Sequence, residues 1–178
     1  MLARNLYALI ALVVFATLAA PAVAEDGAAS VAGQLAGLFV QSCLEFAGNS
    51  NALRDWAKQT GLQELPGQAQ DAFLYGLPGV VFDATNKTGK LVLISEDGGS
   101  CSVVAERASG AAVIDTLEQE LRRAKISFNL SHDGDDPKER VLHHREYTAT
   151  MGKRSWLLLV STVKDSAAGE AMLTANAD

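Results

Sequence analysis

Apolar residues recur at helical spacing in three segments of the first half of the chain. The segments cover residues 31–46, 51–61 and 66–76, and each ends at or near a glycine. Apolar positions three or four residues apart form one face of an amphipathic helix, and glycine commonly ends one. The first segment has the longest apolar stripe, which consists of Val31, Leu35, Leu38, Phe39, Cys43 and Phe46.

Beyond Pro78 the pattern changes to short runs of β-branched and aromatic residues. These runs lie at residues 79–84, 90–94 and 101–105, with Gly, Asn and Asp between them. Such runs bounded by turn residues are typical of strands, and links of a few residues join antiparallel neighbours. This part of the sequence predicts a three-strand meander.

A longer helix and a second group of strands complete the pattern. Ser109 is placed to cap a helix whose apolar side contains Val113, Leu117 and Leu121. Apolar and polar residues then alternate, which is typical of a strand with one wet face. The expected strands lie at residues 126–131, 140–150 and 156–163, with a loop at 133–137.

This order of elements predicts an α+β fold. Three helices, a β-meander, a long helix and a second β-meander would pack as helices on an antiparallel sheet, in a layered arrangement of the profilin-like type. We expect one domain over residues 25–165, with a disordered start at 25–30. The alanine-rich residues 166–178 are expected to form a flexible C-terminal tail.

The N-terminal residues have the pattern of a cleavable signal peptide. Arg4 precedes an apolar run at residues 6–16, and Ala22 and Ala24 form the small-residue pair that a signal peptidase requires. The run is shorter than the roughly 20 residues that span a bilayer. We therefore predict a signal peptide over 1–24 and a periplasmic product with no membrane anchor after cleavage.

Charge narrows the choice of partners. The chain carries 15 Lys and Arg against 21 Asp and Glu, for a net charge of −6. The only basic residue of the leader is Arg4, so the processed chain would be slightly more acidic. Such a chain is a poor candidate for binding nucleic acid or anionic lipid. No phosphate-binding loop, nucleophile elbow or zinc-protease motif is present in the sequence, so we expect no cofactor.

The two cysteines, Cys43 and Cys101, are expected to form a disulfide. An even number of cysteines in an oxidising compartment favours pairing, and two separate buried thiols are the alternative. Closing this loop would stabilise the fold by about 4 kcal/mol in the chain-entropy model. Neither cysteine is part of a C-x-x-C pair, which argues against a redox-catalytic role.

All three histidines lie in the second half of the chain, close to acidic residues. If the strands on either side of the 133–137 loop pair, His132 comes near either His143 or His144, because adjacent strand residues face opposite sides. His132, one of these two histidines and Asp133 together are a weak candidate for a metal or acid/base site. Without Asp133 the two histidines are one ligand short of a zinc centre. Solvent-exposed hairpin residues are the favoured interpretation, and no metal is predicted.

An aromatic group precedes and enters the first strands. Trp56, Phe73 and Tyr75 are its most informative members. The favoured interpretation is that they fill the seam between helices and sheet. If Trp56 or Tyr75 is exposed, the group becomes the best candidate for an interaction surface.

Two cysteines enclose a W-A pair at residues 56–57 and an F-L-x-G run at residues 73–76. With this combined motif, residues 38–121 resemble a family of small exported proteobacterial proteins with two cysteines, and that family has no activity that could be transferred to this chain. The resemblance implies a periplasmic, Gram-negative setting. The matching segments are residues 43–49, 53–57, 73–76, 78–84, 89–93 and 99–107.

The sequence therefore favours a periplasmic binding module that is not an enzyme, with a periplasmic or envelope protein as its partner. A hydrolase using His132, Asp133 and His143 or His144 is the first alternative. An immunity or inhibitor protein is the second. The sequence leaves the oligomeric state open.

Overall fold

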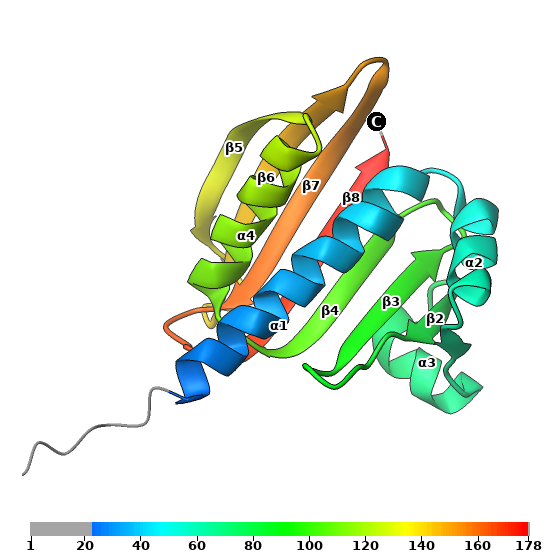
Figure 1. Cartoon of the computed structure of the whole chain (residues 1–178), viewed down its shortest axis with the longest axis horizontal. Coiled ribbons are helices and arrows are strands. Elements are labelled where there is room, and N and C mark those ends of the chain that lie inside the picture. Colours follow the sequence, from blue (N-terminus) through cyan, green and yellow to red (C-terminus); the bar gives the residue numbers. More distant parts are fainter. Residues whose placement is uncertain (1–22, 178) are drawn as a thin grey trace, which may run out of the picture.

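The computed structural model describes residues 23–177 of the chain (Figure 1). Apart from its last two positions, the leader expected at residues 1–24 lies outside the described residues. Helix α1 spans Val23–Phe39 and continues as a π-helical turn, η1, over Val40–Leu44. The expectation of a disordered start at residues 25–30 was wrong. These residues are helical because Ala28 and Val31, at 4% and 5% exposure, already pack against the body of the protein.

The π-turn explains how the end of this helix meets the sheet. Ser42, Cys43 and Leu44 are all buried, although three successive residues of a regular α-helix point in directions about 100° apart. The wider turn is stabilised at its start by the Ser42 hydroxyl, which donates to the Leu38 carbonyl at 2.7 Å. An irregular turn of this kind lets one short segment bury three side chains in succession.

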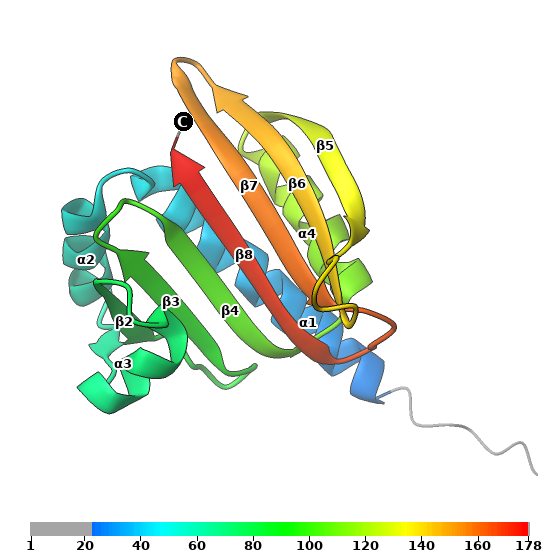
Figure 2. The same cartoon turned by 180° about the vertical axis from the view of Figure 1, so that it is seen from behind.

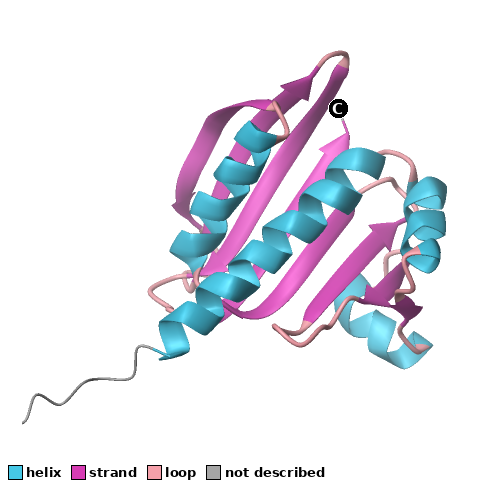
Figure 3. Cartoon of the chain, viewed as in Figure 1, coloured by secondary structure: helices cyan, strands magenta, loops and turns pink. Residues whose placement is uncertain are grey.

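The described strands form one antiparallel sheet of eight strands, in the order β1-β2-β3-β4-β8-β7-β6-β5. The α+β class is therefore confirmed (Figure 3). Strand β5 includes Asp133 and Asp135, so the loop expected at residues 133–137 begins later than the sequence indicated. The strands are β1 (Gln63–Glu64), β2 (Gly79–Asp83), β3 (Leu91–Glu96), β4 (Cys101–Ala108), β5 (Ser127–Asp135), β6 (Leu142–Met151), β7 (Arg154–Val163) and β8 (Gly169–Ala177).

The two halves of the chain follow the same plan. In the first, α1 precedes the meander β1 to β4, and in the second, α4 (Gly110–Arg123) precedes the meander β5 to β8. The final strands of the two meanders, β4 and β8, pair with each other at the centre of the sheet. Each half thus contributes one long helix and four strands, one strand more than the sequence indicated, and the first half also contains two shorter helices.

The extra strand in the second half is β8, where we had expected a flexible tail. Ala171, Leu173 and Ala175 are buried on one face of this strand, at 1% exposure or less. Their alternation with Met172, Thr174 and Asn176, which face the other side, is a strand pattern, but alanine has a low strand propensity and obscures it. Small residues suit this position because α1 crosses the sheet directly over β4 and β8 (Figure 1).

Helices cover the two faces of the sheet unequally. Helices α1 and α4 lie side by side on one face and enclose the main core with it (Figure 1). Helix α2 (Ser50–Gln59) contacts η1 and β3. Helix α3 (Gly67–Leu74) lies on the opposite face, over β2 and β3, and none of the helices in residues 23–177 covers β8, β7 and β6 on that side (Figure 2).

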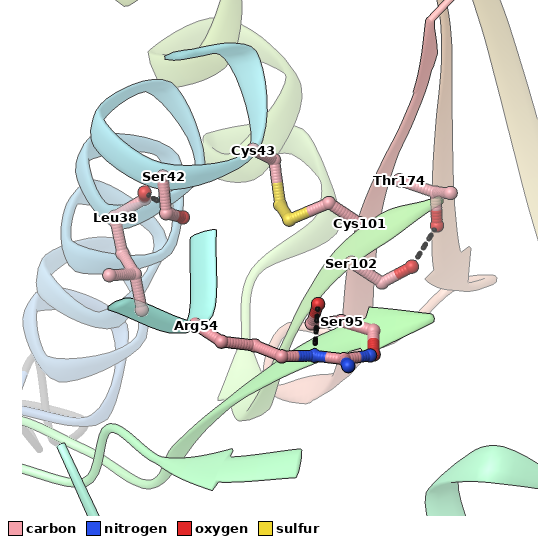
Figure 4. Close-up of a disulfide and its surroundings, with 8 residues drawn as sticks. All are labelled: Leu38, Ser42, Cys43, Arg54, Ser95, Cys101, Ser102 and Thr174. Carbon is pink, nitrogen blue, oxygen red and sulfur yellow. Dashed lines mark hydrogen bonds between the residues drawn. A yellow bond between two sulfur atoms is a disulfide. The ribbon is translucent and has the colours of Figure 1, made fainter. Parts of the chain in front are cut away.

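A disulfide joins the helical layer to the sheet, as the sequence predicted. Cys43 of η1 and Cys101 at the start of β4 are bonded, with their Cα atoms 5.2 Å apart (Figure 4). Both are essentially inaccessible, at 0% and 1% exposure. Nearby, Arg54 of α2 donates to the hydroxyl and the carbonyl of Ser95, which ties α2 to β3 (Figure 4).

The window Gly27–Leu44 is the one described helical stretch long and apolar enough to cross a membrane by length and composition. Half of this window is buried inside the protein. Its most apolar side chains, including Leu35 and Phe39 at 0% exposure, face the sheet. The buried half of the window is therefore part of the main core.

Candidate functional site

Helix α3 creates a second, smaller apolar cluster on the otherwise open face of the sheet. Leu74 of α3 packs there with Val81, Ile94 and Val104 from three successive strands. The helix is held close, since Gln70 accepts a hydrogen bond from the Val81 backbone and donates one to the Leu65 carbonyl. Gly79 allows this approach, because a Cβ there would lie 2.8 Å from the Leu74 side chain and 2.7 Å from the Ser95 carbonyl.

A groove of about 430 Å³ runs beside this helix. Its apolar lining comes from Phe73 of α3 and from Val92 and Val104 on neighbouring strands, together with Leu65. Phe73, Val92 and Leu65 are only partly buried, although they belong to the second cluster. Ligand sites are commonly concave and mostly apolar, with a few polar groups at the edge, and this groove fits that description.

The rim of the groove is acidic. Asp83, Glu106 and Glu170 line it, with Lys90 as the only basic residue among them. Lys90 pairs with Glu106 at 3.2 Å, but both side chains are more than half exposed, so water screens the pair and it is weak. The rim therefore carries two more negative than positive charges.

Hydrogen bonds from Thr85 keep one of these acids ionised. They lower the pKa of Asp83 from its ordinary value, and the Thr85 backbone N–H donates to the Asp83 carboxylate at 2.8 Å. The negative charge of Asp83 is therefore present at neutral pH.

The open face continues from the groove across the second half of the sheet. Met172 of β8 packs at the edge of the second cluster, and Thr174 on the same strand shares a 2.8 Å hydrogen bond with Ser102 (Figure 4). Leu157 of β7 lies on this face and is 43% exposed, whereas its neighbour Leu158 points into the main core at 0%. The face is thus a mixed surface of apolar and hydroxyl side chains.

The three aromatic residues expected to fill the seam between helices and sheet, or to form an interaction surface if Trp56 or Tyr75 is exposed, do not lie together. Trp56 is half-buried against the main core, with its ring centroid 6.0 Å from that of Phe46. Phe73 lines the groove. Tyr75 is 88% exposed just beyond α3, in the left-handed region with φ 49°. Tyr75 takes this conformation as the C-cap of α3, where its backbone N–H donates to the Asp71 carbonyl.

The paired strands β5 and β6 bring Asp133 and His143 together, as the candidate group required, but His132 does not join them. His143 contacts two carboxylates, Asp133 at 2.7 Å and Asp135 at 3.2 Å. Arg145 also pairs with Asp133, at 2.7 Å, and Lys164 pairs with Asp135. The cluster faces α4, where a cavity of about 590 Å³ includes His143, Asp135 and Lys164 in its lining.

Positive neighbours hold this cluster in its ionised form. The pKa of Asp133 is lowered chiefly by its hydrogen bond from Arg145, and that of Asp135 chiefly by its hydrogen bond from Lys164. The carboxylates are thereby engaged with side chains of the same protein. A carboxylate paired in this way is a poor general acid at neutral pH.

His144 points to the opposite face and forms a Ser-His-Asp chain. The Ser161 hydroxyl lies 2.8 Å from His144 Nδ1, and an Asp136 oxygen lies 2.9 Å from His144 Nε2. Ser161 is only 7% exposed. Ser161 pairs with His144 of β6 and with Met172 of β8 in the sheet. The backbone around it is therefore engaged in strand pairing and does not provide the N–H groups of an oxyanion hole.

His132 stands apart from the other two histidines. It is exposed and pairs across the ladder with Glu146, after a bulge between Leu130 and His132. The bulge displaced it from the position that simple pairing predicts. Among the described residues there is no group of three or more His, Cys, Asp or Glu side chains arranged to hold a metal ion.

Sequence reasoning missed the groove residues other than Phe73. Glu106 follows an apolar run of β4, and Glu170 precedes the alternating pattern of β8. A charged residue at the end of a strand usually marks its wet end, so neither signal indicated a site. Their proximity depends on the pairing of β4 with β8, two strands far apart in the sequence.

Comparisons with protein-family models, with curated proteins and with solved structures gave no match to this chain.

Proposed function

We propose that this chain is an exported periplasmic protein that binds a partner protein without catalysing a reaction, and that it does so through the groove beside α3. One observation carries the proposal. The described part of the chain leaves the face of the sheet opposite α1 and α4 uncovered beyond α3, and Phe73, Val92 and Leu65 are only partly buried there (Figure 2). A partly covered apolar groove with a charged rim is the usual form of a binding surface.

Export is supported by the leader pattern of residues 1–24 and by the buried disulfide. Disulfides persist in oxidising compartments such as the periplasm. The intact mass of the protein recovered from a Gram-negative host tests this part. We expect a chain that starts at Glu25 and lacks two hydrogens at Cys43 and Cys101. A full-length, fully reduced chain would contradict export.

Photo-crosslinking tests the binding surface. A photoreactive phenylalanine analogue in place of Phe73 reports on the groove, and the same analogue in place of Gln119, exposed on α4, is the matched control. In periplasmic extract we expect a discrete adduct from position 73 and none from position 119. Equal adducts at both positions, or none at either, would contradict binding at the groove.

The hydrolase alternative has one observation in its favour, the hydrogen-bonded chain Ser161–His144–Asp136. The burial of Ser161 and its paired backbone argue against it. We propose instead that the hydrogen bonds from Ser161 to His144 and from His144 to Asp136 fix the end of the β5–β6 hairpin against β7. Labelling with a fluorophosphonate probe separates the two: a Ser161-dependent label, absent from Ser161→Ala, would establish the hydrolase.

The nature of the partner would decide between a general binding module and an immunity or inhibitor protein. A crosslinked toxin or cell-wall hydrolase would favour the inhibitor. A periplasmic or envelope component without such activity would favour the general module.

The profilin-like layering stays a prediction about the fold family. It is supported by helices on both faces of an antiparallel sheet, with α1 and α4 on one side and α3 on the other (Figures 1 and 2). The resemblance of residues 38–121 to small exported proteobacterial proteins also stays a prediction. Matching cysteine pairs and groove residues in such proteins would support it.

A further inference from the structure

We infer that the groove beside α3 takes a cationic amphipathic segment of the partner protein, one that places Lys or Arg side chains next to apolar ones. This inference rests on the proposed binding function and adds the chemistry of the partner. It is carried by the combination of an apolar floor and an acidic rim in one groove.

The floor of the groove selects for apolar side chains. Phe73 approaches from the helix, and Val92 and Val104 rise from two paired strands. A groove of about 430 Å³ has room for a few large side chains and not for a folded domain. Burying the partly exposed area of Phe73 and Val92 under such side chains would remove apolar surface from water, which favours association.

The rim selects for positive charge. Asp83 lies at one end of β2, while Glu106 and Glu170 lie on the paired strands β4 and β8. Glu170 has no ion-pair partner within 4.0 Å among the described residues. Arg107, which follows Glu106 in the sequence, lines a neighbouring cavity at the start of α1 and is not among the residues that line this groove. A cation that approaches the groove therefore meets a negative field beside a low-dielectric floor, which strengthens the attraction.

The surroundings of the groove favour a polypeptide. Beyond Glu170 the open face continues through Met172 and Thr174 on β8 and on to Leu157 of β7. A chain bound in the groove can extend over this face and form further contacts. A second copy of this protein is a poor occupant, because it would present another acidic groove, and like charges placed together cost affinity.

Synthetic peptides test the charge preference. The probe is a fluorescein-labelled peptide of about 14 residues, or four helical turns, with Lys and Leu at amphipathic spacing. Its matched counterparts replace every Lys by Glu or every Leu by Ser. With the oxidised mature protein, we expect anisotropy to show binding of the Lys/Leu peptide that weakens as salt is added, and no binding of the other two.

Variants of the rim connect that binding to the groove. Glu106→Gln with Glu170→Gln removes two exposed charges, and the affinity for the Lys/Leu peptide should fall about three- to tenfold. Asp115→Asn with Glu120→Gln removes two charges from α4, away from the groove, and should change the affinity less than twofold. Thermal unfolding of each variant checks that the fold is retained.

The outcomes separate this inference from the proposed function. Equal binding of the Lys/Leu and Glu/Leu peptides, or equal losses from the two double variants, would overturn the charge preference. If no peptide binds but position 73 still gives a specific crosslink, the binding function stands and the cationic partner is wrong. If neither assay gives a signal, both are wrong.

Discussion

The two faces of the sheet differ in how completely they are closed. On the face covered by α1 and α4, the side chains of Phe39, Leu158 and Leu173 are at 0% exposure, and a disulfide joins the layers. On the other face α3 is the one helix among the described elements that packs, its apolar cluster is small, and Leu157 stays 43% exposed. We propose that the difference corresponds to two roles: the closed face stabilises the fold, and the partly open face binds the partner.

Of the changes considered for the two faces, removing the disulfide of the closed face should lower the free energy of unfolding most. Cys43→Ala with Cys101→Ala releases a loop with a sequence separation of 58. The free energy of unfolding should fall by about 4 kcal/mol in the chain-entropy model, as measured by urea unfolding. A change below about 1 kcal/mol would show that the closed face holds together without its covalent link.

A pair of neighbouring leucines tests the two faces directly. Leu158→Ala should cost about 2–5 kcal/mol, because it leaves a cavity in the main core. Leu157→Ala, one residue earlier on the same strand, should cost less than about 1 kcal/mol, because its side chain is already partly in water. Equal costs in urea unfolding would mean that the open face is not open in solution.

The closed face could be predicted from the sequence more completely than the open one. The stripe from Val31 to Cys43 indicated both the helix and the side that is buried, and the even cysteine count indicated the disulfide. Both signals are local, because they depend on spacing within one element or on two residues of one type. By contrast, the sequence did not indicate strand β8, whose small residues are favoured by the close passage of α1.

The candidate site was less predictable, for a physical reason. The groove exists because α3 lies on the other face of the sheet and because β4 pairs with β8. The sequence pattern of these elements indicates neither arrangement. The histidines show the same limit. Pairing of β5 with β6 was expected, but the bulge before His132 decided which carboxylates His143 meets.

The Asp133–Arg145 ion pair of the β5–β6 hairpin should make the smallest contribution to the free energy of unfolding, and this contribution depends on pH. Arg145 lowers the pKa of Asp133 in the folded protein. The resulting stabilisation is present above the ordinary pKa of 3.8 and is lost as the pH falls through the lower folded value. Asp133→Asn should cost up to about 1 kcal/mol at pH 7, since the pair is partly exposed.

The same variant should unfold like the parent at a pH well below 3.8, where both carry a neutral side chain at this position. Denaturant unfolding at the two pH values measures the difference. Asp115→Asn on α4 is the control and should show no such dependence. If Asp133→Asn still lowers the free energy of unfolding at the acid pH, packing and not charge stabilises the hairpin.

The claim on which the account depends is that a partner binds the open face beside α3. Amide hydrogen exchange of the oxidised mature protein, with and without the Lys/Leu peptide, tests it most directly. We expect slower exchange in Gly67–Leu74 and in Gly169–Ala177, with no change in Gly110–Arg123. Protection of Gly110–Arg123 in place of the other two segments would place binding on the closed face and contradict the account.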